Sequence, residues 1–352
     1  MMTETRTEDA ALKTSWLPMV SLFLAQVLMS FNVAALPISL GGMVEDFGVP
    51  PTIASSTIVV YGLAVAALAM TGAKLGQRVG WVLIDLSIID SPRERAAVYA
   101  MFIVVALEAC VNFSIPLYIQ IVQGRTPFDT SLAMMPFNLT VFITATLVVR
   151  FYKRYPPRTI GVFGFILTTV ALVWLSIVVN NNWETFPTIL GLFVFGVGQG
   201  ALVTLVFNVL VTAAPAELAG DVGSLRGTTQ NLASAVGTAV AGALLVSVLG
   251  ISVGRAVVEH PELPPSLVAQ VNMDDVNFIS NHDLRVVLEG TDATPEQVDA
   301  AVAVNEESRL NTLKIGLLIL AGISALAILP ASRLPRYKPD EIPDPSPVAA
   351  GE

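Results

Sequence analysis

Residues 185–216 read TFPTILGLFVFGVGQGALVTLVFNVLVTAAPA, a run of 32 residues without a charged side chain. A helix needs about 20 mostly apolar residues to cross a bilayer, so this run is long enough to span one. Its apolar residues are spread evenly rather than alternating, which favours a helix over a barrel strand. Similar runs cover residues 14–44, 47–73, 130–149, 159–183, 227–254 and 315–332, and one more, 96–124, is interrupted only by Glu108. The sequence therefore predicts an all-α, polytopic membrane protein with about eight transmembrane helices.

The composition agrees with this class. Of the 352 residues, 54% are hydrophobic and 13% are charged, and the mean hydropathy is +0.69. Soluble domains carry about 25% charged residues, so a soluble enzyme, a basic nucleic-acid binder and a disordered chain are excluded. One cysteine, Cys110, and two histidines, His260 and His282, exclude a disulfide framework and a metal site built from these residues. We expect no cofactor, no nucleic-acid partner and no enzymatic activity.

The first run is expected to be a span rather than a cleaved signal peptide, because it is about twice as long as a signal's apolar core. Basic residues then orient the chain. With the N-terminus inside, the cytoplasmic segments hold 14 of the 19 lysines and arginines, four of them in the turn at residues 150–158. The other five are Arg125, Arg255, Arg285, Arg309 and Lys314. An excess of positive charge in short loops marks the cytoplasmic side, so both termini are expected inside a plasma (inner) membrane.

Most of the negative charge lies in one segment. Residues 254–311 contain eleven acidic residues and three arginines, against a net charge of −9 for the whole chain. A soluble external loop explains this better than an acidic binding surface. Within it, Thr294, Pro295 and Gln297 have the spacing of an N-cap, a first-turn proline and a capping box. We expect a helix over residues 298–304, running toward the last span.

A short glycine-containing segment follows the second run, GAKLGQRVG at residues 72–80. By itself it predicts a turn, with Gly76 and Gly80 allowing close approach and Lys74 and Arg78 at the cytoplasmic interface. It resembles the cytoplasmic loop motif of the major facilitator superfamily, Gly-x-Leu-Gly-Asp-Arg-x-Gly-Arg. Three positions depart from that motif: Ala73 replaces a glycine, Gln77 the acid and Trp81 a basic residue.

Further stretches are similar to the second half of the 14-span drug:proton antiporters of this superfamily: residues 83–95, 118–124, 132–136 and 219–239. The resemblance implies a partial major-facilitator fold. Residues 1–80 would supply the first two helices and the loop motif, and residues 81–334 a six-helix C-terminal bundle with the acidic segment outside. Six middle spans would be missing near residues 79–83. Residues 335–352 are rich in proline and predict a disordered cytoplasmic tail.

Glu108 is the only charged residue within the predicted spans. A charged carboxylate near the centre of a span costs roughly 2.5–3.5 kcal/mol on insertion scales, so Glu108 should face a cavity or be protonated. A proton-carrying site and a neutral carboxyl that bonds a neighbouring helix both fit. Asn112 lies one turn further along the same face and would share the site.

Uncharged polar residues in or beside the spans either line a substrate cavity or join helices by hydrogen bonds of about 0.6 kcal/mol each. They are Asn32, Asn138, Gln199, Asn208, Gln230 and Asn231. The glycines within residues 191–200 lack the strand context of a nucleotide-binding loop and predict close helix packing instead.

Two functional hypotheses follow. The resemblance implies a transporter that couples protons to the efflux of small amphipathic or cationic compounds. The alternative is a non-transporting remnant or accessory subunit with a single six-helix bundle. Alternating access requires two bundles, and two helices cannot form the second, so we expect an active chain to pair with a copy of itself or with another protein.

Overall fold

The computed structural model describes residues 35–36, 39, 42–43, 46–49, 51–78, 92–152, 154–213, 219–259, 281–290 and 293–336. Within these ranges the chain is helical apart from short connections, and it contains no strand. The helices are α2 (Pro51–Arg78), α3 (Pro92–Leu117), the π-helix η2 (Tyr118–Val122), α4 (Pro127–Tyr152), α5 (Pro157–Val178), α6 (Phe186–Ala213), α7 (Ala219–Glu259), α10 (Asn281–Glu289), α11 (Pro295–Leu326) and α12 (Ile328–Ala331). Five of them begin at a proline, whose fixed φ and missing N–H suit the first helical position.

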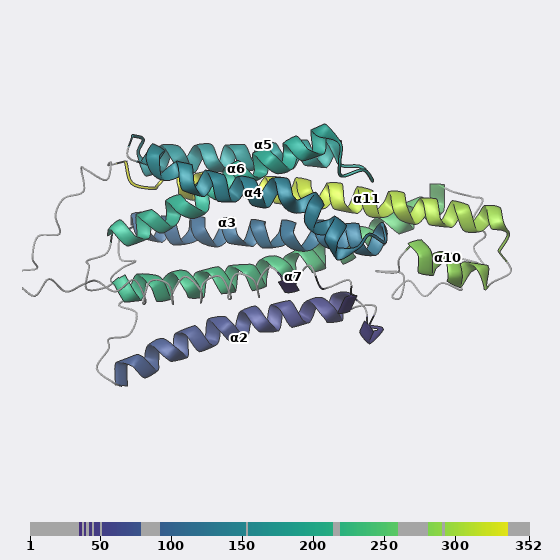
Figure 1. Cartoon of the computed structure of the whole chain (residues 1–352), viewed down its shortest axis with the longest axis horizontal. Coiled ribbons are helices and arrows are strands. Elements are labelled where there is room, and N and C mark those ends of the chain that lie inside the picture. Colours follow the sequence, from purple (N-terminus) through teal and green to yellow (C-terminus); the bar gives the residue numbers. More distant parts are fainter. Residues whose placement is uncertain are drawn as a thin grey trace, which may run out of the picture. The chain divides into compact units, whose positions relative to one another are not determined.

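Six long helices, α3 to α7 and α11, pack side by side (Figure 1). The helix α6 packs on α3, α4 and α5, while α11 packs on α3, α5 and α7. Their shared core joins Met101 and Val104 of α3 to Phe165 of α5 and to Leu202 and Val206 of α6, all buried. The remaining long helix, α2, lies along α7. The described helices therefore form a six-helix bundle with α2 beside it.

Among the described residues, five helices are long and apolar enough to cross a membrane: Arg95–Val122, Pro127–Tyr152, Pro157–Val178, Phe186–Leu210 and Pro295–Ala331. The predicted runs 47–73 and 227–254 coincide with α2 and α7. Most of the predicted first span, 14–44, lies outside the described residues. The all-helical, membrane-spanning class is confirmed.

Glycines bring α6 close to its neighbours, as the sequence predicted for residues 191–200. An ideal Cβ on Gly196 would lie 2.7 Å from the carbonyl oxygen of Phe137, and one on Gly200 would lie 2.6 Å from that of Val141. Both oxygens belong to the backbone of α4. On another side of α6, a Cβ on Gly198 would lie 2.4 Å from Oγ1 of Thr168 in α5. Small residues thus let three helix backbones approach one another, as is common in membrane bundles.

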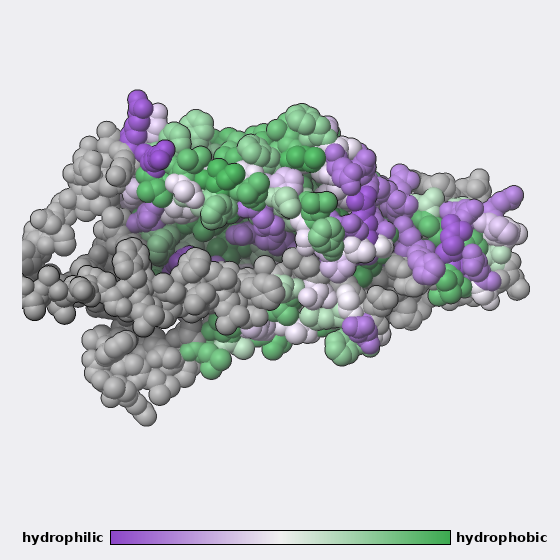
Figure 2. All heavy atoms as spheres, in the orientation of Figure 1, coloured by the Kyte–Doolittle hydropathy of each residue, from purple (hydrophilic) through white to green (hydrophobic). Residues whose placement is uncertain are grey.

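The helix α11 is longer than a bilayer requires. Its 32 residues extend about 48 Å at 1.5 Å per residue, against a hydrocarbon thickness of about 30 Å. Its N-terminal part packs on α10 through Leu284, Leu288 and Val298, and Arg285 Nη1 lies 2.7 Å from Asp299 Oδ1. Hydrophilic surface gathers over this pair of helices (Figure 2). The expected helix over residues 298–304 is therefore confirmed, and it is continuous with the last span.

The capping box at residues 294–297 is also confirmed. Gln297 N donates to Thr294 Oγ1 at 3.3 Å, and Thr294 N donates to Gln297 Oε1 at 3.0 Å. We expect Thr294→Ala to weaken this helix end by about 1 kcal/mol, which corresponds to about fivefold faster amide exchange over residues 295–300.

Hydrogen–deuterium exchange measures this effect. The control is Thr146→Ala, because the Thr146 hydroxyl donates only to Phe142 O in its own helix. Equal exchange in the two variants at residues 295–300 would contradict the capping role.

Two expectations need revision, and two more lie beyond the described residues. Residues 72–78 continue α2 as a helix instead of forming a turn, because the alanine, lysine, leucine, glutamine and arginine there are strong helix formers. At the other boundary, α7 continues to Glu259, past the predicted span end at residue 254. The proposed join at residues 79–83 and the tail after residue 336 lie outside the described residues.

Candidate functional site

Glu108 lies near the middle of α3 and is partly exposed. Its neighbours Leu107 and Val111 are buried. Within the described part of the chain, Glu108 has no hydrogen-bond or ion-pair partner. Figure 2 shows a hydrophilic area over the middle of α3, beside the hydrophobic surface of α4 to α6.

Asn112 is one turn further along α3 and is also partly exposed. It too has no partner among the described residues. The structure thus places together the two groups that the sequence assigned to one site, a carboxyl and an amide on one helix face.

Contacts with α7 hold this part of α3 in place. Cys110 Sγ donates a hydrogen bond to Gly237 O at 3.0 Å. A Cβ on Gly237 would lie 2.4 Å from the carbonyl oxygen of Ala106, so the two helix backbones are in direct contact. Packing on this side limits rotation of α3 and so keeps Glu108 at its present face.

The other predicted amides are spread over three helices. Asn138 of α4 is exposed and donates to Met134 O at 3.2 Å, and Asn231 of α7 is buried and donates to Gly227 O at 2.8 Å. Gln230 of α7 is exposed, and Asn208 of α6 is partly buried. Gln199 of α6 is fully buried, and both of its amide atoms lack a partner in the described residues.

The remaining predicted residues are those of the loop motif and Asn32, and no contact of their side chains is described. Lys74, Gly76 and Arg78 belong to the last turns of α2. Asn32 and Gly80 lie outside the described residues.

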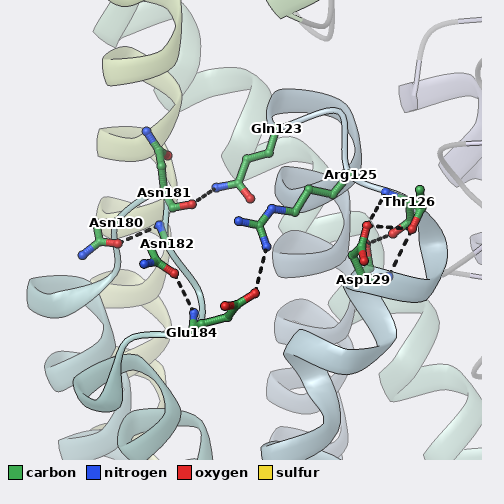
Figure 3. Close-up of polar contacts among 9 residues, drawn as sticks. Gln123, Arg125, Thr126, Asp129, Asn180, Asn181, Asn182 and Glu184 are labelled. Carbon is green, nitrogen blue, oxygen red and sulfur yellow. Dashed lines mark hydrogen bonds and ion pairs between the residues drawn. The ribbon is translucent and has the colours of Figure 1, made fainter.

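A second polar cluster lies around η2 and the residues that follow it. Sequence analysis did not identify this cluster. Tyr118 Oη donates to Asn181 Oδ1 at 2.6 Å, Asn181 Nδ2 donates to Glu306, and Gln123 Nε2 donates to Asn181 O at 3.0 Å. Figure 3 shows Gln123 and Arg125 directed toward the α5–α6 connection, where Arg125 Nη1 lies 3.9 Å from Glu184 Oε1. This network joins η2, the α5–α6 connection and α11.

Arg309 of α11 belongs to the same end of the bundle. The sequence treated it only as an external charge, but its side chain is 5% exposed. Arg309 Nε donates to Asn305 Oδ1 at 2.9 Å, and Asn305 Nδ2 donates to Asn281 Oδ1 of α10 at 2.8 Å. The four-residue spacing of Asn305 and Arg309 was the available signal, because residues four apart share a helix face.

A family comparison covers the first part of this bundle. Residues 82–238 match the Major Facilitator Superfamily. The match extends over α3 to α6 and the first half of α7. It includes three of the stretches on which the sequence resemblance rested, 83–95, 118–124 and 132–136, and all but the last residue of the fourth, 219–239.

Individual relatives are similar over part of their length. The tetracenomycin C resistance and export protein of Streptomyces glaucescens is 28% identical over 189 residues, which are 53% of this chain and 35% of that protein. The multidrug resistance protein Stp of Mycobacterium tuberculosis is 25% identical over 219 residues, 60% of this chain and 38% of that protein. The chain spans less than half the length of the curated relatives that it matches.

Among solved structures, the chain is similar to a bacterial homologue of the human lysosomal transporter Spinster, in an inward-facing and unoccupied conformation. It aligns with a TM-score of 0.45 and 14% identity, covering 68% of this chain and 48% of that one.

Proposed function

We propose that this chain is a transporter subunit of the major facilitator type that exchanges protons for small amphipathic or cationic compounds. The observation that carries this proposal is the partly exposed and unpartnered carboxyl of Glu108, in the middle of a membrane-length helix. Intramembrane carboxyls are costly, and in transporters they commonly mark proton sites. The names of the relatives, which describe export and multidrug resistance, support the same class of substrate.

In this mechanism Glu108 alternates between a protonated and an ionised form. The ionised form attracts a cationic compound to the face that carries Asn112, whose amide offers a donor and an acceptor to the polar part of the compound. Protonation removes the charge and weakens that attraction. A proton and a cation thus compete for one site, which couples their movements in opposite directions.

The test uses purified chain in proteoliposomes, with ethidium as the cationic probe. An imposed proton gradient should drive ethidium movement, and a protonophore should stop it. Rates equal to those of protein-free vesicles, with and without the gradient, would overturn the proposal and favour the alternative of a non-transporting subunit.

The proposed topology places both termini in the cytoplasm and the acidic segment outside. The basis is the asymmetry of the basic residues, 14 of 19 on one side. Reporter fusions at Ala213 and Gln270 should give opposite signals, with Ala213 inside. The same signal from both fusions would refute the topology.

A second bundle is also part of the proposal. The described helices supply one six-helix bundle and α2, whereas alternating access moves two bundles against each other. We expect the active form to contain a second copy, which cross-linking in membranes measures. Transport by a chain that remains monomeric would contradict this expectation.

A further inference from the structure

Basic side chains gather at one end of the bundle, in the α4–α5 connection and in the residues that follow α12. Figure 2 shows hydrophilic side chains at this end of α5, next to the hydrophobic surface of the helices. The sequence contains no acidic residue at positions 148–160 or 327–336. The described basic residues of these two segments, called the arginine cluster below, are Arg150, Arg154, Arg158, Arg333 and Arg336.

Backbone contacts bring the two segments of the cluster together. Arg158 N donates to Pro335 O at 3.1 Å. An ideal Cβ on Gly161, in the first turn or two of α5, would lie 2.7 Å from Cδ1 of Leu334. Arg158 therefore lies beside the backbone that carries Arg336, although the two residues are far apart in the sequence.

Buried residues between the arginines fix both segments to the bundle. Tyr152 is 7% exposed and Leu334 is 2% exposed, and both belong to the shared core. Arg154, Arg333 and Arg336 follow or flank these two residues and are exposed. Because Tyr152 and Leu334 occupy the core, the arginines beside them remain at the surface.

The cluster lies at the level of lipid headgroups. The charge-free runs 130–149, 159–183 and 315–332 all begin or end beside it, and residues at the end of a span reach the membrane interface. Phe151 and Tyr155 of the same connection are 55% and 44% exposed, and their ring centroids lie 6.5 Å apart. Exposed tyrosine is typical of this level of the membrane.

The positive charges of the cluster have no partner within the described part of the chain. The ion pairs found there involve Arg125 and Arg285 instead, and no side chain of the cluster makes a hydrogen bond to another described residue. The N-terminus of α5 lies at the same place without a side-chain cap, and its partial positive charge also favours an anion. Guanidinium groups bind phosphate through paired hydrogen bonds.

An apolar surface continues from the cluster toward the middle of the membrane. Leu147 of α4 is 44% exposed, and Phe163 and Ile166 of α5 are 69% and 41% exposed. These residues lie within two or three turns of the arginines along their helices, at the depth of acyl chains. A phosphate site followed by apolar surface matches the two parts of a phospholipid.

We infer that the arginine cluster binds the phosphate headgroup of an anionic phospholipid, whose acyl chains lie along α4 and α5. Basic sites between the ends of membrane helices are known to bind such headgroups. The bound lipid joins the α4–α5 connection to the residues after α12. The proposed topology places this lipid in the cytoplasmic leaflet, and the inference does not depend on transport.

Native mass spectrometry of the purified full chain in detergent tests the site. The probes are phosphatidylglycerol, which is anionic, and phosphatidylcholine, which has no net charge. The variant Arg158→Gln/Arg336→Gln removes two charges from the cluster. The matched control, Lys74→Gln/Arg78→Gln, removes two charges from the last turns of α2, which packs along α7.

We expect wild type to bind phosphatidylglycerol about tenfold more tightly than phosphatidylcholine, and the cluster variant to lose about thirtyfold in affinity for phosphatidylglycerol. The control should change that affinity by less than about threefold, because charges outside the cluster are screened. Equal losses in the two variants would overturn the inference, since basic residues would then act only through general surface charge. Equal affinity of wild type for the two lipids would overturn it too.

Two further measurements separate the lipid from other anions. Inorganic phosphate at the concentration of the lipid should leave phosphatidylglycerol bound, and its displacement would show that the cluster selects phosphate without a lipid. The chain also continues with acidic residues at positions 340, 341 and 344. Neutralising these three should leave the affinity within about threefold of wild type, whereas a gain of about tenfold would show that the tail occupies the cluster, which overturns the inference.

Size-exclusion elution checks that each variant is folded. If Arg158→Gln/Arg336→Gln does not elute as wild type does, the variant Arg154→Gln/Arg333→Gln takes its place, because both of these arginines are exposed. We expect the same loss of about thirtyfold from it, and unchanged affinity would overturn the inference. None of these measurements involves transport, so this inference and the proposed function can fail separately.

Discussion

Glu108→Gln is expected to abolish proton-gradient-driven ethidium transport while leaving the protein folded and in the membrane. Glutamine keeps the size and hydrogen-bonding capacity of a protonated carboxyl, but it cannot release a proton. Glu108 has no partner in the described residues, so no hydrogen bond or ion pair between them is lost. The measurement is the initial rate in proteoliposomes, with size-exclusion elution as the check on folding.

The matched control is Glu307→Gln. Glu307 is an exposed acid on α11 outside the proposed site, so its substitution should leave the rate unchanged. Because Glu108→Gln mimics the protonated form, it should also make the remaining ethidium flux insensitive to pH. If transport in the Glu108→Gln variant keeps the pH dependence of the wild type, Glu108 does not carry the coupled proton.

Gly200→Val is expected to cause the largest loss of folded protein. An ideal Cβ at this position lies 2.6 Å from Val141 O and 3.0 Å from Thr144 Cβ, so the backbone of α4 would have to move away from α6. Overpacking costs about 1–3 kcal/mol and more where a backbone must shift. Apart from its contact with η2, the packing of α4 within the described bundle rests mainly on α6, so we expect most of the monodisperse peak in detergent to be lost.

Gly322→Val serves as the control. Nothing lies within 4 Å of an ideal Cβ at Gly322 in α11, and valine has a somewhat higher helix propensity than glycine. The monodisperse peak of this variant should match that of the wild type, and Gly200→Ala should fall between the two. An unchanged peak for Gly200→Val would show that α4 does not depend on its close contact with α6.

Local sequence features were sufficient to predict where the helices lie in the chain. Charge-free runs of about 20 residues predict spans because a bilayer leaves no other partner for the backbone. The predicted runs from 47–73 onward each coincide with one of the helices α2 to α7 and α11, although α7 continues past its run to Glu259 and α5 ends before its run does, at Val178. The capping box at Thr294 and Gln297 was equally predictable, because both partners are three residues apart.

Side-chain surroundings were less predictable, and Gln120 and Gln199 illustrate the reason. Both are amides in apolar runs, as is Asn138, yet Gln199 is fully buried and Asn138 is exposed. Helical periodicity cannot separate these cases, because the runs are apolar on all sides and do not indicate which face meets a neighbour.

The sequence by itself determined that the chain is a helical membrane protein, where its helices run, and that Glu108 and Asn112 share one face. Each of these properties depends only on residues that belong to the same helix. Only the tertiary structure decided that Glu108 is partly exposed, that Arg309 and Gln120 are buried, and that glycines of α6 contact the backbone of α4. Those properties depend on which helices become neighbours, and that choice is made by close packing between segments far apart in the chain.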